Sequence, residues 1–98
     1  MVIIVRTSMP GESVQSVITR MKEEPEVPSY VVEKGHYITI NTVEGVAGLR
    51  IFEAPKDKLA DAYEAISNRM AKYIGITSFK YEIKIWTDVQ DAIKRVTP

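Results

Sequence analysis

The side chains that could carry chemistry in this 98-residue chain are few, because it contains no cysteine and a single histidine, His36. A thiolate zinc site, a cysteine nucleophile and a multi-histidine metal site are therefore excluded, and we expect neither a metal nor a cofactor. What remains is a set of charged and aromatic residues that the strand pattern places on one sheet face. Its members are Arg6, Tyr37, Arg50, Phe52, Glu82 and Trp86. Arginine beside aromatic rings suits a small, flat, anionic ligand, but these residue types are also enriched in protein interfaces. We predict that the set forms a ligand-binding face or a dimer face.

His36 is the candidate for acid–base chemistry near neutral pH. In the strand pairing predicted below, it faces Glu53. The two residues form either an ion pair at the sheet edge that contributes little energy, or a general base whose pKa the carboxylate raises. The ion pair is the simpler interpretation.

The charge balance limits the partners of the chain. Lys and Arg number 13 and Asp and Glu number 13, so the formal net charge is zero. A protein that binds nucleic acid without sequence preference is expected to carry a basic excess. No segment approaches the roughly 20 apolar residues of a membrane span, and the first residues lack the basic start of a secretion signal. We expect a cytoplasmic protein that binds neither nucleic acid nor membrane. Asn and Gln number only two each, which is typical of thermophilic proteins.

The elements that must position these residues follow from periodicity. Ile and Val together number 23 and Leu only two, which favours a sheet-rich core. Alternating or continuous apolar runs predict strands, and apolar residues three and four apart predict helices. The predicted strands cover 2–5, 30–42, 46–53 and 79–86, and the predicted helices cover 14–24, 55–74 and 88–96. Gly35 is expected at a bulge or bend, and Thr87 and Gln90 have capping-box spacing.

The order strand, helix, strand, strand, helix, strand predicts a single ferredoxin-like α+β domain over residues 1–98, with sheet order 4-1-3-2 and a short C-terminal helix. A two-residue turn at Glu44-Gly45 would pair Tyr37 with Phe52 and Thr39 with Arg50. This register places Ile38, Ile40, Leu49 and Ile51 under the helices and leaves the charged and aromatic set on the open sheet face. An open aromatic face on a small protein needs a cover, and a second copy of the chain is the simplest one.

The second half of the chain, from Gly45 to Val96, resembles a group of small uncharacterised bacterial and archaeal proteins of the dimeric α/β-barrel superfamily. The shared features are a glycine-led third strand, a long helix ending in a tyrosine, an aromatic-led fourth strand and a short terminal helix. The resemblance implies the ferredoxin-like fold and a homodimer. Because the superfamily includes cofactor-free monooxygenases, isomerases and ligand binders, the resemblance implies no single reaction.

Two other families with this element order are weaker matches. RNA-recognition domains stack bases on aromatic residues of strands 1 and 3, and here the first strand has no aromatic residue. Acylphosphatases carry a glycine-rich phosphate loop, which residues 14–20 resemble in part, with Arg20 and Asn41 in the catalytic positions. Ser16 replaces the central glycine, so the backbone cradle is in doubt. The Gly45-Val46-Ala47-Gly48 segment is assigned to a turn.

The function expected from the sequence is therefore that of a small homodimeric protein that binds a small molecule on its open sheet face. The alternatives are a cofactor-independent oxygenase or isomerase of the same superfamily, or an acylphosphatase-like hydrolase.

Overall fold

The structure is a computed structural model that describes residues 1–43 and 45–97. Its strands and helices follow the predicted order. They are β1 (Val2–Met9), α1 (Val14–Met21), β2 (Val32–Asn41), β3 (Gly45–Glu53), α2 (Leu59–Met70), β4 (Lys80–Trp86) and α3 (Val89–Val96), with short 3-10 segments η1 (Gly11–Ser13), η2 (Lys56–Lys58) and η3 (Ala71–Tyr73). None of the described helices is long and apolar enough to cross a membrane.

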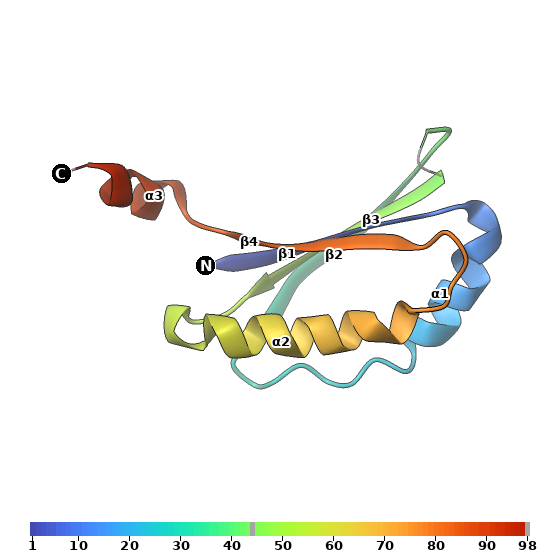
Figure 1. Cartoon of the computed structure of the whole chain (residues 1–98), viewed down its shortest axis with the longest axis horizontal. Coiled ribbons are helices and arrows are strands. Elements are labelled where there is room, and N and C mark those ends of the chain that lie inside the picture. Colours follow the sequence, from blue (N-terminus) through green and yellow to red (C-terminus); the bar gives the residue numbers. More distant parts are fainter. Residues whose placement is uncertain (44, 98) are drawn as a thin grey trace.

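The chain has an α+β fold built on one four-stranded antiparallel sheet. The strand order is β2-β3-β1-β4, which is the order 4-1-3-2 read from the opposite edge. Figure 1 shows α1 and α2 on one side of the sheet, so the opposite face is open. We call these the helix face and the open face.

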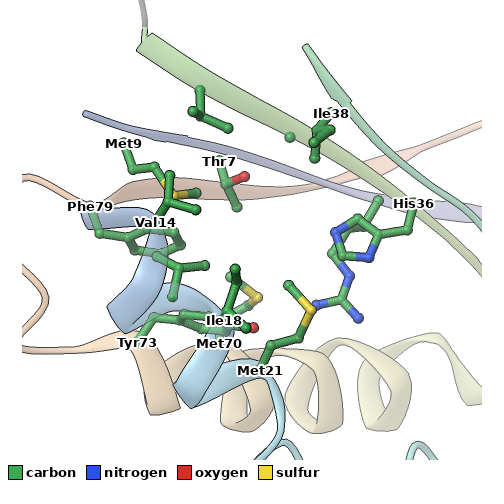
Figure 2. Close-up of a pocket in the computed structure, with 14 residues that line it drawn as sticks. Thr7, Met9, Val14, Ile18, Met21, His36, Ile38, Met70, Tyr73 and Phe79 are labelled. Carbon is green, nitrogen blue, oxygen red and sulfur yellow. The ribbon is translucent and has the colours of Figure 1, made fainter. Parts of the chain in front are cut away.

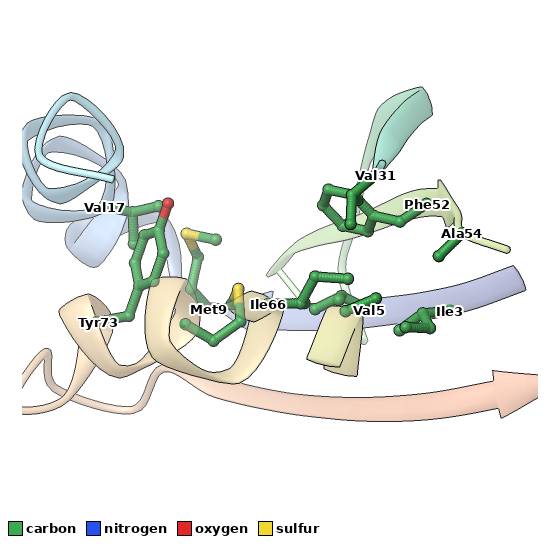
Figure 3. Close-up of a cluster of buried hydrophobic side chains, with 11 residues drawn as sticks. Ile3, Val5, Met9, Val17, Val31, Phe52, Ala54, Ile66 and Tyr73 are labelled. Carbon is green, nitrogen blue, oxygen red and sulfur yellow. The ribbon is translucent and has the colours of Figure 1, made fainter. Parts of the chain in front are cut away.

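The core lies between α2 and the helix face of the two central strands (Figure 3). Ile3 and Val5 of β1 are fully buried there, and Phe52 of β3 is 1% exposed. Ala62, Ile66 and Met70 repeat at helical spacing and form the buried side of α2, as its periodicity predicted. Alternation along β4 is also as predicted, because Ile83 pairs with Val5 and therefore shares its face.

The predicted pairing of β2 with β3 is wrong. The structure pairs Asn41 with Gly45, Tyr37 with Leu49 and His36 with Arg50, which displaces the register by three residues. Since side chains alternate between faces, an odd displacement exchanges the two faces of β3 relative to β2. Arg50 and Phe52 therefore lie on the helix face, and Leu49 and Ile51 lie on the open face. Ile38 and Ile40 keep the predicted face, but both are largely exposed, at 68% and 76%.

The turn explains part of the displacement. Asn41 pairs with Gly45, in place of the predicted two-residue turn that would have paired Val43 with Val46, and Glu44 lies outside the described residues. The Asn41 Oδ1 atom accepts a hydrogen bond from the Val43 backbone nitrogen at 3.0 Å, which is an Asx-type turn. Gly45 then starts β3 with a φ of +75°, a conformation that favours glycine.

A bulge in β2 lies where Gly35 predicted one. Glu33 pairs with Phe52 and Gly35 pairs with Ile51, so Lys34 is the extra residue. In a regular strand Glu33 and His36 would point to opposite faces, because they are three residues apart. The bulge turns both toward the helix face, beside Arg50.

The last helix lies apart from the rest of the fold. Figure 1 shows α3 beyond the end of the sheet. Asp88 caps it by accepting a hydrogen bond from the Gln90 backbone nitrogen at 2.8 Å, so the cap is one residue later than the predicted Thr87. The radius of gyration is 15.0 Å, compared with about 13 Å for a compact domain of this length. The apolar residues of α3, including Val89, Ile93 and Val96, remain exposed.

Candidate functional site

An apolar hollow lies on the helix face, between α1 and strands β2 and β3. It has a volume of about 160 Å³, and we call it the α1 cleft (Figure 2). Its lining is almost entirely apolar and comes from every layer of the fold. The lining residues are Thr7, Met9, Val14, Val17, Ile18, Met21, His36, Ile38, Val46, Gly48, Arg50, Met70, Tyr73 and Phe79.

The cleft is left unfilled by side chains at two places, which are Gly48 in the sheet and the end of α1. Gly48 lies in the sheet between Thr7 of β1 and Ile38 of β2, where it contributes no side chain. A Cβ added at Gly48 would come within 2.4 Å of Thr7 Oγ1, so the missing side chain also makes room for that hydroxyl. The second element is α1, whose eight residues do not reach over Ile38. Ile18 and Ile38 therefore face each other across an opening rather than a packed interface.

Three methionines line the cleft. The chain has four methionines, and Met9, Met21 and Met70 all line this site. Methionine is unbranched and polarizable, so it adapts to irregular apolar partners and contacts aromatic rings favourably. The lining can therefore adjust to ligands of different outline.

One wall of the cleft is a buried network of charges centred on Arg50, which we call the Arg50 cluster. Its other members are Glu24, Glu33, Arg69 and Tyr73. Arg50 Nη1 donates to Glu24 Oε1 at 2.7 Å and Arg50 Nε donates to Glu33 Oε2 at 2.8 Å. Arg50 Nη2 donates to both carboxylates, at 3.2 and 3.1 Å. Arg69 Nη2 lies 2.7 Å from Glu24 Oε2, and the Tyr73 hydroxyl donates to Glu24 Oε1.

The cluster draws its residues from segments far apart in the sequence. Glu24 ends the turn after α1, just before Pro25, and Glu33 is turned inward by the β2 bulge. Arg69 comes from α2 and Tyr73 from η3. Both guanidinium groups also lie over the Phe52 ring, with Arg50 Cζ at 5.4 Å and Arg69 Cζ at 5.8 Å from its centroid. Among the described residues, no atom accepts a hydrogen bond from the buried Arg69 Nε or Nη1.

The cluster is electrically balanced, with two arginines against two carboxylates. Burial alone would raise the pKa of Glu24, but hydrogen bonds from Arg50 and Tyr73 and the two arginine charges hold that pKa below its ordinary value. Burial and the hydrogen bond to Glu24 raise the pKa of Tyr73, so its hydroxyl stays protonated. All three nitrogens of Arg50 donate to carboxylates. Arg50 is therefore occupied within the protein and offers little to an anionic ligand.

His36 stands at the rim of the cleft, opposite Arg50 in the sheet. Burial and the nearby Arg50 charge lower the pKa of His36, so the imidazole is neutral at neutral pH. Its Nδ1 atom lies 4.0 Å from Glu33 Oε2. The predicted pairing of His36 with Glu53 is wrong, because Glu53 instead forms an ion pair with Lys34, at 3.2 Å.

The structure divides the predicted charged and aromatic set between two faces. Arg50 and Phe52 belong to the helix face, so the prediction that they share the open face is wrong. The open face does hold the other four members, which are Arg6, Tyr37, Glu82 and Trp86. In the sheet, Arg6 pairs with Glu82, Tyr37 pairs with Leu49, and Trp86 pairs with Val2. Their role as a ligand or dimer face stays a prediction.

The residues of the acylphosphatase hypothesis have local structural roles. Arg20 Nη1 donates to the Lys72 carbonyl at 3.0 Å, which joins α1 to η3. Asn41 closes the hairpin turn. Neither residue lines the α1 cleft. Within residues 1–43 and 45–97, no group of three His, Asp or Glu side chains could hold a metal ion.

Neither the Arg50 cluster nor the α1 cleft was predicted from the sequence. Gly48 was assigned to a turn, whereas it lies in the interior of β3. A glycine inside a strand often marks a bulge or a close approach, and that signal could have indicated the hollow. Nothing local connects Glu24 with Arg50, which follows 26 residues later.

No family model matches the chain, and no curated protein matches it. Among solved structures, the de novo designed protein Foldit4 has a TM-score of 0.52 at 21% identity, with 89% of this chain and 96% of that chain covered. This likeness concerns the fold alone. A formyltetrahydrofolate deformylase from Pseudomonas putida KT2440 gives a TM-score of 0.47 at 13% identity, covering 88% of this chain and 29% of that one. A DUF3240 family protein from Shewanella baltica OS155 gives 0.34 at 14% identity, covering 89% and 92%.

Proposed function

We propose that this chain is a small-molecule-binding protein that holds a compact, largely apolar ligand in the α1 cleft. The observation that carries the proposal is the cleft itself, an unfilled hollow of about 160 Å³ lined by three methionines and by Phe79. Ile38 and the apolar edge of α1 are left in contact with water there. A ligand that covers them gains about 25 cal/mol for each Å² of apolar surface removed from water.

The Arg50 cluster supports a binding role because it makes one wall of the cleft rigid. Each charged member is held by at least one ion pair or hydrogen bond at 2.7 or 2.8 Å. A wall that is ordered before the ligand arrives reduces the entropic cost of binding. The methionine side chains supply the adaptable part of the same site.

Methionine methyl NMR tests the proposal directly. In protein labelled with 13C at the methionine methyl groups, toluene or indole should shift the signals of Met9, Met21 and Met70. Met1 is the internal control, since it lies eight residues before Met9 along β1, about 26 Å at the usual strand rise. If all four signals stay in place with millimolar probe, the cleft does not bind small apolar molecules.

Two exposed isoleucines of β2 provide a matched pair of variants. Ile38 lines the cleft and Ile40 does not, and both are largely exposed. Ile38→Glu should abolish probe binding, because it places a carboxylate in the opening. Ile40→Glu should leave binding unchanged. Equal losses in the two variants would show that the probe does not sit in the cleft.

A second copy of the chain is the partner we propose for the open face, in a ferredoxin-like domain of the dimeric α/β-barrel type. Val2, Ile4, Leu49 and Ile51 form an apolar band there, bordered by Tyr37 and Trp86. Val89, Ile93 and Val96 of α3 are further exposed apolar side chains, beyond the end of the sheet. Light scattering should give twice the 11.1 kDa of one chain. Ile4→Lys should shift the mass to that of a monomer, and a wild-type monomer at micromolar concentration would contradict the assembly.

Proton transfer on the bound ligand is the second candidate function, in line with the oxygenase or isomerase alternative. One observation favours it, namely that a neutral imidazole lines an apolar cleft, where it can act as a general base. Deuterium exchange at the acidic carbon of a small aryl ketone, followed by NMR, provides the test. The chain should accelerate the exchange and His36→Leu should abolish the acceleration; no acceleration by the wild type removes this candidate.

A further inference from the structure

We infer that the ligand of the α1 cleft is a single aromatic ring that carries one hydroxyl group, a phenol, with the ring inside the cleft and the hydroxyl donating to Nε2 of His36. This inference rests on the proposed function and adds the chemical class of the ligand and the residue that selects it. Three features of the site support it. They are the volume of the cleft, the neutral imidazole of His36 as a hydrogen-bond acceptor, and the hydrogen bonds that Arg50 already donates to Glu24 and Glu33.

The size of the cleft limits the ligand to about one ring. Its volume is about 160 Å³, and an apolar protein cavity of roughly 150 Å³ accommodates benzene. The surrounding methionines and the Phe79 ring favour an aromatic guest, since thioether sulfur and aromatic edges both contact rings favourably. A two-ring or long-chain ligand would extend out of the opening beside Ile38.

His36 offers the cleft a hydrogen-bond acceptor. Its Nδ1 atom lies 4.0 Å from Glu33 Oε2, too far for a hydrogen bond, but the negative charge of that carboxylate favours the tautomer with the proton on Nδ1. Nε2 then carries the lone pair, and no described residue donates to it. Figure 2 shows the imidazole at the rim, beside Ile38 and above the apolar interior. Because the ring is neutral, it accepts a proton donor and has no charge with which to attract an anion.

The other polar groups of the lining argue against a charged or multiply polar ligand. Arg50 donates all its nitrogens to Glu24 and Glu33, and the Tyr73 hydroxyl donates to Glu24. The Thr7 hydroxyl lies against Gly48 in the floor of the sheet. A carboxylate ligand would therefore find the one cation of the lining, Arg50, already donating to Glu24 and Glu33, whereas one hydroxyl at the rim finds an acceptor in His36.

The test compares phenol, toluene and fluorobenzene, which have the same number of heavy atoms and differ in hydrogen bonding. Affinities come from titrations of the methionine methyl signals in wild type, His36→Leu and His36→Gln. His36→Leu should weaken phenol binding about fivefold, the usual effect of one lost hydrogen bond. It should change toluene and fluorobenzene binding less than twofold, and His36→Gln, which keeps an acceptor oxygen, should recover part of the loss.

A second readout uses the fact that His36 is the only histidine in the sequence. In 15N-histidine-labelled protein the Nε2 signal should shift with phenol and stay in place with toluene. If toluene binds but phenol does not, or if phenol binding survives His36→Leu unchanged, the inference is overturned while the proposed function stands. If no probe moves the methionine signals, the proposed function fails and the inference fails with it.

Discussion

Replacing Arg50 with alanine is the sharpest perturbation of this fold. The Arg50 side chain is 6% exposed and the Glu24 side chain is 4% exposed, so both ends of the pair are buried. Arg50→Ala removes the ion pairs to Glu24 and Glu33 and the guanidinium group over Phe52. Glu33 is nearer the surface and can regain water, but Glu24 cannot. It keeps only Arg69 and the Tyr73 hydroxyl as partners.

The expected cost follows from that burial. Breaking a buried ion pair by removing one partner typically costs about 3–5 kcal/mol, because a charge is left uncompensated. A domain of this size has a total stability of roughly 5–15 kcal/mol, so the variant should lose a large part of it. Arg50→Lys should cost less, since one ammonium retains a charge but cannot donate in fork geometry to two carboxylates.

Urea denaturation followed by far-UV circular dichroism, at one protein concentration, measures these changes as shifts of the midpoint. Arg6→Ala is the matched control, since it also removes an arginine from a central strand position but on the open face, and all variants are made in the Ile4→Lys background so that no second copy covers that face. We expect less than about 1 kcal/mol for this control. If Arg50→Ala costs no more than Arg6→Ala, Arg50 is not in a buried network and the register of β2 and β3 described above is wrong.

Three further outcomes are expected. In the folded chain the pKa values of Glu24 and His36 both lie below their ordinary values of 4.5 and 6.5. Each group therefore contributes stability that is present above its unfolded pKa. That contribution is lost as the pH falls through its folded pKa. The free energy of unfolding should therefore decline below about pH 6.5 and again below about 4.5, and His36→Gln should remove the first decline in denaturation curves recorded between pH 4 and 8. Gly48→Ala should destabilise the fold by about 1–3 kcal/mol through overpacking against Thr7, and the double variant with Thr7→Ala should recover most of this loss; additive effects in the thermodynamic cycle would refute the contact. In the Ile4→Lys background, where no second copy covers the open face, Ile51→Ala should cost less than about 2 kcal/mol, because this side chain lies on that face and not in the core, and a loss typical of a core deletion would contradict that placement.

The elements themselves could be predicted because their causes are local. The apolar spacing of α2 and the alternation of β4 are properties of a few consecutive residues, and both predictions are confirmed. Gly35 marked the bulge and Gly75, with a φ of +97°, lies where the second helix was expected to stop. The element order and the arrangement of four antiparallel strands with helices on one face follow from these local patterns and from the handedness of the connections.

The register of one hairpin, and with it the site, was decided by the tertiary structure. Both pairings of β2 with β3 bury apolar residues, and the pattern alone favoured the one that keeps Arg50 out of the core. The structure places Arg50 inside because Glu24, from the turn after α1, and Glu33, turned inward by the bulge, compensate its charge there. The α1 cleft likewise depends on Gly48, Ile38 and α1 meeting across three separate segments. Such long-range compensation leaves no periodic trace in the sequence, so it could be seen only once the chain was folded.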